Sequence, residues 1–78
     1  MIDNESLAAL IHREIPDASL EIVDRTGTMD HFNITVRSRT FAGHTLIEQH
    51  RMVYGALSAA LRDGRVHAVE LKTIVSES

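Results

Sequence analysis

The chain has 78 residues, a formal net charge of −3 and no cysteine. A chain of this length accommodates one domain, 1–78, whose small core leaves little volume for a deep substrate cavity. The lack of cysteine excludes disulfides, thiolate metal ligands and a cysteine nucleophile within the chain. Small secreted domains commonly depend on disulfides, and the sequence has neither a long apolar run nor a signal-like N-terminus. We therefore expect a cytoplasmic protein that does not enter a membrane.

The first predicted element is an amphipathic helix from Glu5 to Ile15. Its apolar residues are spaced three and four positions apart, as on one face of a helix: Leu7, Ala8, Leu10, Ile11 and Ile15. Asp3 and Asn4 precede it as candidate N-caps. Pro16 ends it, because the residue before a proline avoids the α region.

Two strands are predicted next, from Ser19 to Asp24 and from Phe32 to Val36. In the second, apolar residues alternate with polar ones, which is typical of a strand with one buried face. The six residues from Arg25 to Asp30, which include Gly27, form a loop between them. We expect the two strands to pair as a hairpin.

A long second helix is predicted after Gly43, and Gly64 follows it where a C′ glycine would end it. On a helical wheel one side of this segment is largely apolar: Leu46, His50, Val53, Leu57, Ala60 and Leu61. A separate short helix is expected from Gly43 to Ile47. Val66 to Val75 closes the chain as a strand rich in β-branched residues.

The order of elements is therefore α-β-β-α-α-β, the order of type II KH domains, and the fold class is α+β. A right-handed crossover between the last two strands places the helices on one face of a three-stranded mixed sheet. We expect Phe32–Val36 and Val66–Thr73 to be parallel. Five residues are expected in the core: Phe32, Ile34, Val53, Leu57 and Leu71.

Three linked segments resemble the BolA family. In the stretch Phe41–Leu57, a phenylalanine and a glycine precede a His50-Arg51 pair and a Val53-Tyr54 pair. The closing segment Val66–Thr73 contains a His67-Ala68 dipeptide, and His31-Phe32 matches the end of the hairpin loop. The resemblance runs from about Leu20 to Thr73 in the same order and spacing, and it implies the same α-β-β-α-α-β fold.

The resemblance also implies a partner and a cofactor. BolA proteins pair with monothiol glutaredoxins and share a [2Fe–2S] cluster, so the isolated chain would carry none and would be a monomer or weak homodimer. The closing-strand histidine of the family is a cluster ligand, here His67. The second ligand comes from the hairpin loop and is a cysteine or a histidine; in this cysteine-free chain His31 is the substitute. Arg51 and Tyr54 would belong to the partner-binding surface.

Each of these residues also has a purely structural interpretation. His67 could be a partly buried histidine at a helix-to-strand junction, His31 a solvated residue, and Arg51 an ordinary surface charge. The strand alternation places His67 in the row that faces the helices and His31 in the opposite row. His50 lies within the apolar stripe and is expected to be a hydrogen-bonded core residue. The remaining histidines are interpreted as surface residues: His12 and His44.

The sequence contains no nucleophile elbow, P-loop or pair of carboxylates in a shared apolar setting, so we expect a protein that is not an enzyme. Three hypotheses remain. The chain is a glutaredoxin-partnered iron–sulfur module, a KH-like DNA-binding regulator of transcription in the stress response, or a structural adaptor. The negative charge and scattered arginines predict at most weak DNA binding. The segment from Gly43 to Leu46 also lacks the second glycine of the KH Gly-x-x-Gly loop.

Overall fold

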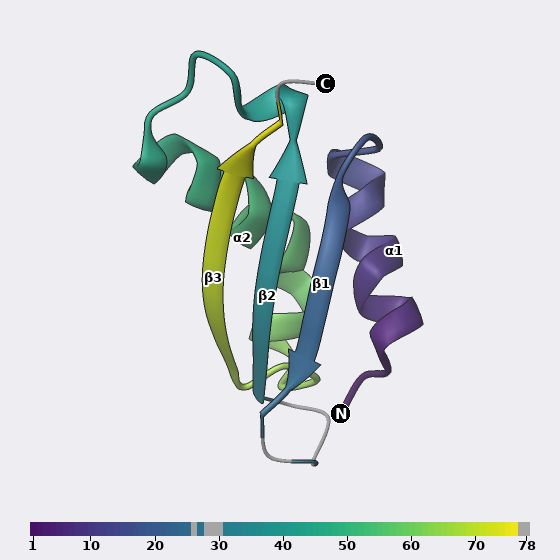
Figure 1. The fold of residues 1–78 in the computed structure, drawn as a ribbon. Helices are drawn as coiled ribbons and strands as arrows, with labels where there is room; N and C mark the ends of the chain where they lie inside the picture. The colour runs from purple at the N-terminus through teal and green to yellow at the C-terminus, as the bar shows by residue number, and fades with distance from the viewer. Residues whose placement is uncertain (26, 28–30, 77–78) are drawn as a thin grey trace.

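The computed structural model describes residues 1–25, 27 and 31–76, and within them two α-helices cover one face of a three-stranded sheet (Figure 1). The sheet order is β1-β2-β3. Strand β1 (Ser19–Asp24) is antiparallel to β2 (His31–Ser38), and β2 is parallel to β3 (Ala68–Val75). The predicted α+β class, the hairpin and the parallel pair are all confirmed. The face of the sheet opposite the helices carries exposed, largely polar side chains.

Helix α1 (Asn4–Glu14) begins one residue earlier than predicted. Asp3 is its N-cap, and the Asp3 carboxylate accepts a hydrogen bond of 2.7 Å from the backbone N–H of Ser6. This bond satisfies one of the N–H groups that a helix start leaves without an intrahelical partner. The helix ends before Pro16, as predicted, and buries Leu7 and Ile11 against the sheet and α2.

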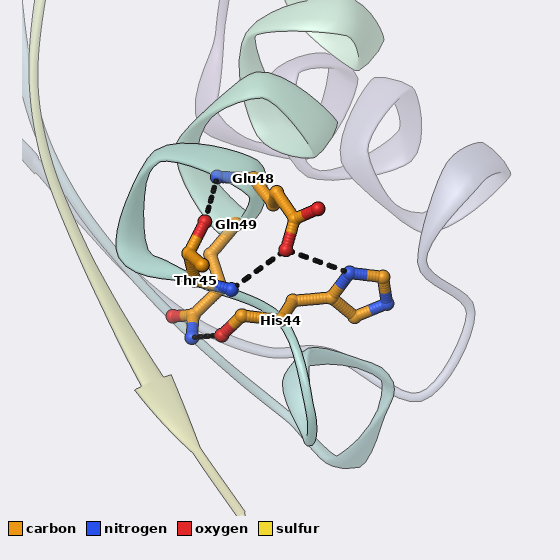
Figure 2. A network of polar contacts seen from close by, with 4 residues as sticks. All are labelled: His44, Thr45, Glu48 and Gln49. Atoms are coloured by element: carbon orange, nitrogen blue, oxygen red, sulfur yellow. Dashed lines mark hydrogen bonds and ion pairs between the residues drawn. The ribbon is translucent and has the colours of Figure 1, made fainter.

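Helix α2 (Leu46–Arg62) begins with a capping box (Figure 2). The backbone N–H of Glu48 donates to the Thr45 hydroxyl at 3.2 Å, and the backbone N–H of Thr45 donates to the Glu48 carboxylate at 2.8 Å. The Thr45 N–H thereby holds the pKa of Glu48 below its ordinary value. His44 Nδ1 lies 3.7 Å from the same carboxylate. These contacts fix the start of α2 at Leu46.

The predicted short helix between Gly43 and Ile47 is wrong in position. The chain instead forms a 3₁₀ turn, η1 (Arg39–Phe41), and α2 is a single helix. Ser38 caps the turn by accepting a hydrogen bond from the Thr40 N–H at 3.0 Å, and the Phe41 ring is fully buried. Gly43, at φ +81°, then turns the chain into the capping box.

The predicted apolar stripe of α2 is correct in its middle and wrong at its start. Val53 and Leu57 are fully buried, but Leu46 is 62% exposed and Gln49 is buried in its place. The buried amide is tolerated because both of its ends are satisfied. Gln49 Nε2 donates to the His44 carbonyl at 2.9 Å (Figure 2). Its Oε1 accepts a hydrogen bond from the Thr73 hydroxyl at 2.7 Å.

The core lies between the sheet and the two helices. Of the five residues predicted to form it, four are at most 1% exposed: Phe32, Ile34, Val53 and Leu57. Leu71 is only partly buried and packs against this core, because β3 is an edge strand. The expected core is therefore confirmed except at Leu71.

Asp17, in the connection between α1 and β1, joins this connection to η1. Its carboxylate accepts hydrogen bonds from the Ser38 hydroxyl at 2.6 Å, the Arg39 N–H at 2.9 Å and the Thr40 hydroxyl at 3.0 Å. The bond from Ser38, whose side chain is buried, is the main reason why the pKa of Asp17 is lowered. Asp17 is thus a structural carboxylate that must be ionised to accept all three bonds.

We expect Asp17→Asn to lower the melting temperature at neutral pH by a few degrees. A carboxylate with a depressed pKa stabilises the fold above the ordinary value of about 3.9. That contribution disappears as the pH falls through the lower pKa of the folded state. The difference in melting temperature between wild type and variant should therefore close below about pH 4. Thermal melts followed by circular dichroism (CD) test this, with the exposed Glu21→Gln as control; a pH-independent difference would contradict it.

A histidine pair at the strand starts

The two histidines predicted to bind metal lie side by side. Because β2 and β3 are parallel, both strands start at the same end of the sheet (Figure 1). His31 is the first residue of β2 and is aligned with Ala68, and His67 directly precedes Ala68. The two ring centroids are 5.9 Å apart, and the ring planes meet at 66°. The parallel register therefore brings together two side chains that are 36 positions apart in the sequence.

His67 is more exposed than the sequence predicted. It was expected to start the row of β3 side chains that faces the helices, but it precedes the strand and its side chain is exposed. Val66 is the residue turned into the core, with 1% exposure. At the other end of the predicted row, Val75 is 41% exposed. His31 is half-buried at the start of its strand.

A short turn between α2 and β3 holds His67 in place. The Asp63 carboxylate accepts hydrogen bonds from Arg65, one from the backbone N–H at 3.0 Å and another from Nε at 2.9 Å. The Arg65 side chain thereby lowers the pKa of Asp63. The Val66 N–H donates to the Ala60 carbonyl at 3.1 Å, which joins the turn to the last turn of α2. His67 thus follows a segment whose backbone is fixed at several points.

Gly64 follows α2, as predicted, and lies beside the His67 ring. Its φ of +84° is a conformation that L side chains rarely adopt. A Cβ at this position would lie 3.8 Å from His67 Nε2, in van der Waals contact with the ring. The imidazole therefore lies against the turn that precedes it.

Replacing Gly64 and Gly55 with alanine should change the free energy of unfolding in opposite directions. Gly64→Ala should reduce the free energy of unfolding by about 1–2 kcal/mol, because a left-handed conformation is strained for alanine. Gly55→Ala, in the middle of α2 with open space around it, should increase it by about 0.5–1 kcal/mol. Urea denaturation measures both changes. Equal effects of the two substitutions would contradict the conformational argument.

The charged groups near the pair are compensated. Arg25, whose backbone N–H donates to the His31 carbonyl at 2.8 Å, lies 3.5 Å from the Glu70 carboxylate. Arg65 is paired with Asp63. Among the described residues, both of these arginines are therefore paired with a carboxylate. In the predicted hairpin loop, residues 26 and 28–30 lie outside the described residues.

The pair provides two nitrogen ligands and no more. Among the described residues there is no group of three or more His, Cys, Asp or Glu side chains that could hold a metal ion. Neutral imidazole binds zinc, copper, nickel and iron. The described residues therefore provide two of the ligands that a metal centre at this position would need.

The side chains predicted to bind a partner lie on an exposed flank of α2. Ile47, Arg51 and Tyr54, spaced at i, i+4 and i+7, form what we call the α2 flank. The Tyr54 hydroxyl lies 3.4 Å from the carbonyl of Val69, the second residue of β3, so the flank adjoins the β3 edge close to His67. Ile47 is 67% exposed and was not singled out in the sequence, although its spacing from Arg51 and Tyr54 could have indicated it.

The other three histidines contact residues outside the pair. His50 is half-buried and meets the Tyr54 ring edge-on at 6.4 Å, so the expectation of a core residue is wrong. His12 and His44 are exposed, as predicted. His12 Nε2 lies 2.9 Å from the Ala18 carbonyl, and His44 contacts Glu48. In the described part of the chain, neither helix is long and apolar enough to cross a bilayer.

Fold and site together define a small α+β domain with a surface histidine pair at the start of two parallel strands. The sequence model of the family described as BolA-like protein matches residues 2–78. The chain therefore belongs to the BolA-like family, and the resemblance noted in the sequence is confirmed.

Individual relatives agree with this assignment. An uncharacterised protein of Rickettsia prowazekii is 33% identical over 73 residues, covering 94% of each chain. The acid stress protein IbaG of Escherichia coli K12 is 33% identical over 54 residues, covering 69% of this chain and 64% of that protein. The structure of BolA1 from Arabidopsis thaliana superimposes with a TM-score of 0.82 at 30% identity, covering 99% of each chain.

Proposed function

We propose that this protein is a non-enzymatic module that pairs with a monothiol glutaredoxin and shares a [2Fe–2S] cluster with it, for iron–sulfur trafficking or iron sensing. The observation that carries the proposal is the convergence of His31 and His67, with ring centroids 5.9 Å apart at the exposed start of two strands. Membership of the BolA-like family supports it.

The donor set fits a shared cluster. A [2Fe–2S] cluster takes four protein ligands, and the Rieske type accepts two imidazoles on one iron. The described residues supply two imidazoles and no third ligand, so a partner would supply the thiolates that this cysteine-free chain lacks. Replacing thiolate by neutral imidazole raises the reduction potential of a cluster, which suits transfer or sensing.

The α2 flank is the surface proposed to bind the glutaredoxin. It combines an apolar residue, a cation and an aromatic ring, the residue types enriched where proteins associate. Its contact with Val69 places it beside the strand that follows His67, so a partner bound there could also reach the histidine pair. We expect Arg51→Ala and Tyr54→Ala to weaken the complex without changing the ligands of the cluster.

The test is to mix the full chain with a monothiol glutaredoxin that carries a [2Fe–2S] cluster. The visible absorption and CD spectra should change, and a heterodimer containing the cluster should elute on size-exclusion chromatography. A cluster spectrum that is unchanged after addition of this chain would contradict the proposal. Cluster-free glutaredoxin serves as the control for association that does not need the cluster.

A second candidate is a DNA-binding regulator of the stress response; the similarity to the acid stress protein IbaG supports the link to stress. With a net charge of −3 and arginines spread along the chain, we expect DNA binding to be weak. It should fall steeply as salt rises, because it would rest on phosphate contacts. Fluorescence anisotropy with labelled duplex DNA at several salt concentrations measures this. A nanomolar complex that persists at physiological salt would favour the regulator instead.

A further inference from the structure

We propose that His31 and His67 also form half of a divalent transition-metal site, which is completed by the same two histidines of a second copy of this chain. The site would take Zn²⁺ or an ion of similar preference, bound by four imidazoles. It involves the same two side chains as the proposed cluster site, but it requires neither a thiol partner nor a cluster.

The spacing of the rings suits one tetrahedral ion. With Zn–N distances of about 2.0–2.1 Å, two imidazoles on one ion have their donor nitrogens roughly 3.4 Å apart and their centroids roughly 5 Å apart. The observed centroid distance is 5.9 Å, so a small rotation of one side chain brings the pair into range. The rings meet at 66°, far from a parallel stack, so they can direct one edge each toward a common point.

The protein backbone holds the pair in advance. His31 is held within the β2 ladder, between β1 and β3, and its carbonyl accepts the Arg25 N–H. His67 is held by the turn from Asp63 to Val66 and lies against Gly64. Ligands that are already positioned lose less conformational entropy when they bind an ion, which favours a site made from few side chains.

We take the remaining two ligands of the proposed site from a second copy of the chain. The described residues of one chain contain no third potential ligand grouped with the pair. A second copy, related by a two-fold axis through the ion, supplies two identical imidazoles, and such an interface closes without forming a polymer. Exposure of His67 makes this approach accessible.

Local charge does not oppose a dication at this position. The two arginines near the pair are each matched by a carboxylate, Arg25 by Glu70 at 3.5 Å and Arg65 by Asp63 at 2.9 Å. The whole chain is acidic, with a net charge of −3, so a bound dication reduces the repulsion between two copies. Imidazole nitrogen prefers Zn²⁺, Ni²⁺ or Cu²⁺ over Mg²⁺ or Ca²⁺.

The experiment adds zinc sulfate to the purified full chain at neutral pH, with no glutaredoxin present. Isothermal titration calorimetry should give one Zn²⁺ per two chains, and sedimentation velocity should show a dimer that EDTA returns to monomer. Co²⁺ in place of Zn²⁺ should give the visible bands of tetrahedral coordination. His67→Ala and His31→Ala should each weaken binding by at least about 10-fold and remove the dimer.

His44→Ala is the matched control, since His44 is exposed and contacts Glu48 instead of the pair; it should bind and dimerise like wild type. A chain that stays monomeric at saturating Zn²⁺, or a His31→Ala/His67→Ala double variant that binds as tightly as wild type, would overturn the proposal. Neither result bears on cluster sharing, which is measured with the glutaredoxin, so the two proposals can fail separately.

Discussion

Replacing His67 with alanine should remove the contribution of this imidazole to the spectrum of the shared cluster while leaving the domain folded. The ring is exposed and precedes β3, so its loss should reduce the free energy of unfolding by no more than about 1–2 kcal/mol. Loss of one of two nitrogen ligands, by contrast, changes the coordination of the iron directly. The measurements are visible CD of the cluster complex and far-UV CD of the chain alone.

Three comparisons make this result specific. His31→Ala should weaken the spectral change by less, because His31 is half-buried at the start of β2 whereas His67 is exposed and accessible to a partner. His44→Ala should behave like wild type, since its contact is with the α2 capping box. A His67→Ala chain that reproduces the wild-type cluster spectrum would show that His67 is not a ligand and that its position is structural only.

Much of the fold follows from local patterns in the sequence. Strand β1 was predicted with its observed bounds, and β2 to within two residues, because apolar and polar residues alternate and loop residues flank the strands. The start of α2 was harder to predict. Leu46 has the apolar character of a core residue, but the capping box makes it the first residue of the helix, where it is exposed.

The burial of Gln49 could not be derived from periodicity. A polar residue at that position is acceptable only because a carbonyl from the preceding loop and a hydroxyl from β3 both meet its amide. Those partners are five and 24 residues away in the chain, so their positions depend on the tertiary structure. A helical wheel sees only the residues of one helix.

The histidine pair shows the same division between local and tertiary information. Each histidine was singled out through a resemblance, and the alternation of β2 correctly placed His31 opposite the core row. Their separation depends on the register of β2 with β3, which aligns His31 with Ala68. The alternation of Val69, Leu71 and Val75 predicted that His67 faces the helices. Val69 and Leu71 do pack against the core, but His67 precedes the first residue of β3, Ala68, and its side chain is exposed.

Phe32→Ala should largely unfold the protein at 37 °C. The ring is 0% exposed, and truncating a buried phenylalanine reduces stability by about 3–5 kcal/mol. A single core in a chain this small rarely contributes more than about 3–5 kcal/mol of net stability. Substituting this one residue can therefore remove most of the free energy of unfolding. Urea denaturation followed by far-UV CD measures it.

Val23→Ala provides the matched control, because Val23 is apolar, lies in the same sheet and is 48% exposed on the open face. It should change the free energy of unfolding by no more than about 0.5–1 kcal/mol. A Phe32→Ala chain within 1 kcal/mol of wild type, roughly the effect expected of a surface change, would contradict the assigned core. Phe32→Ala should also abolish cluster sharing, because the chain unfolds. The far-UV CD signal of the folded chain should then be lost at the same time. His67→Ala should change the spectrum of the cluster and keep the far-UV signal, which separates loss of the fold from loss of a ligand.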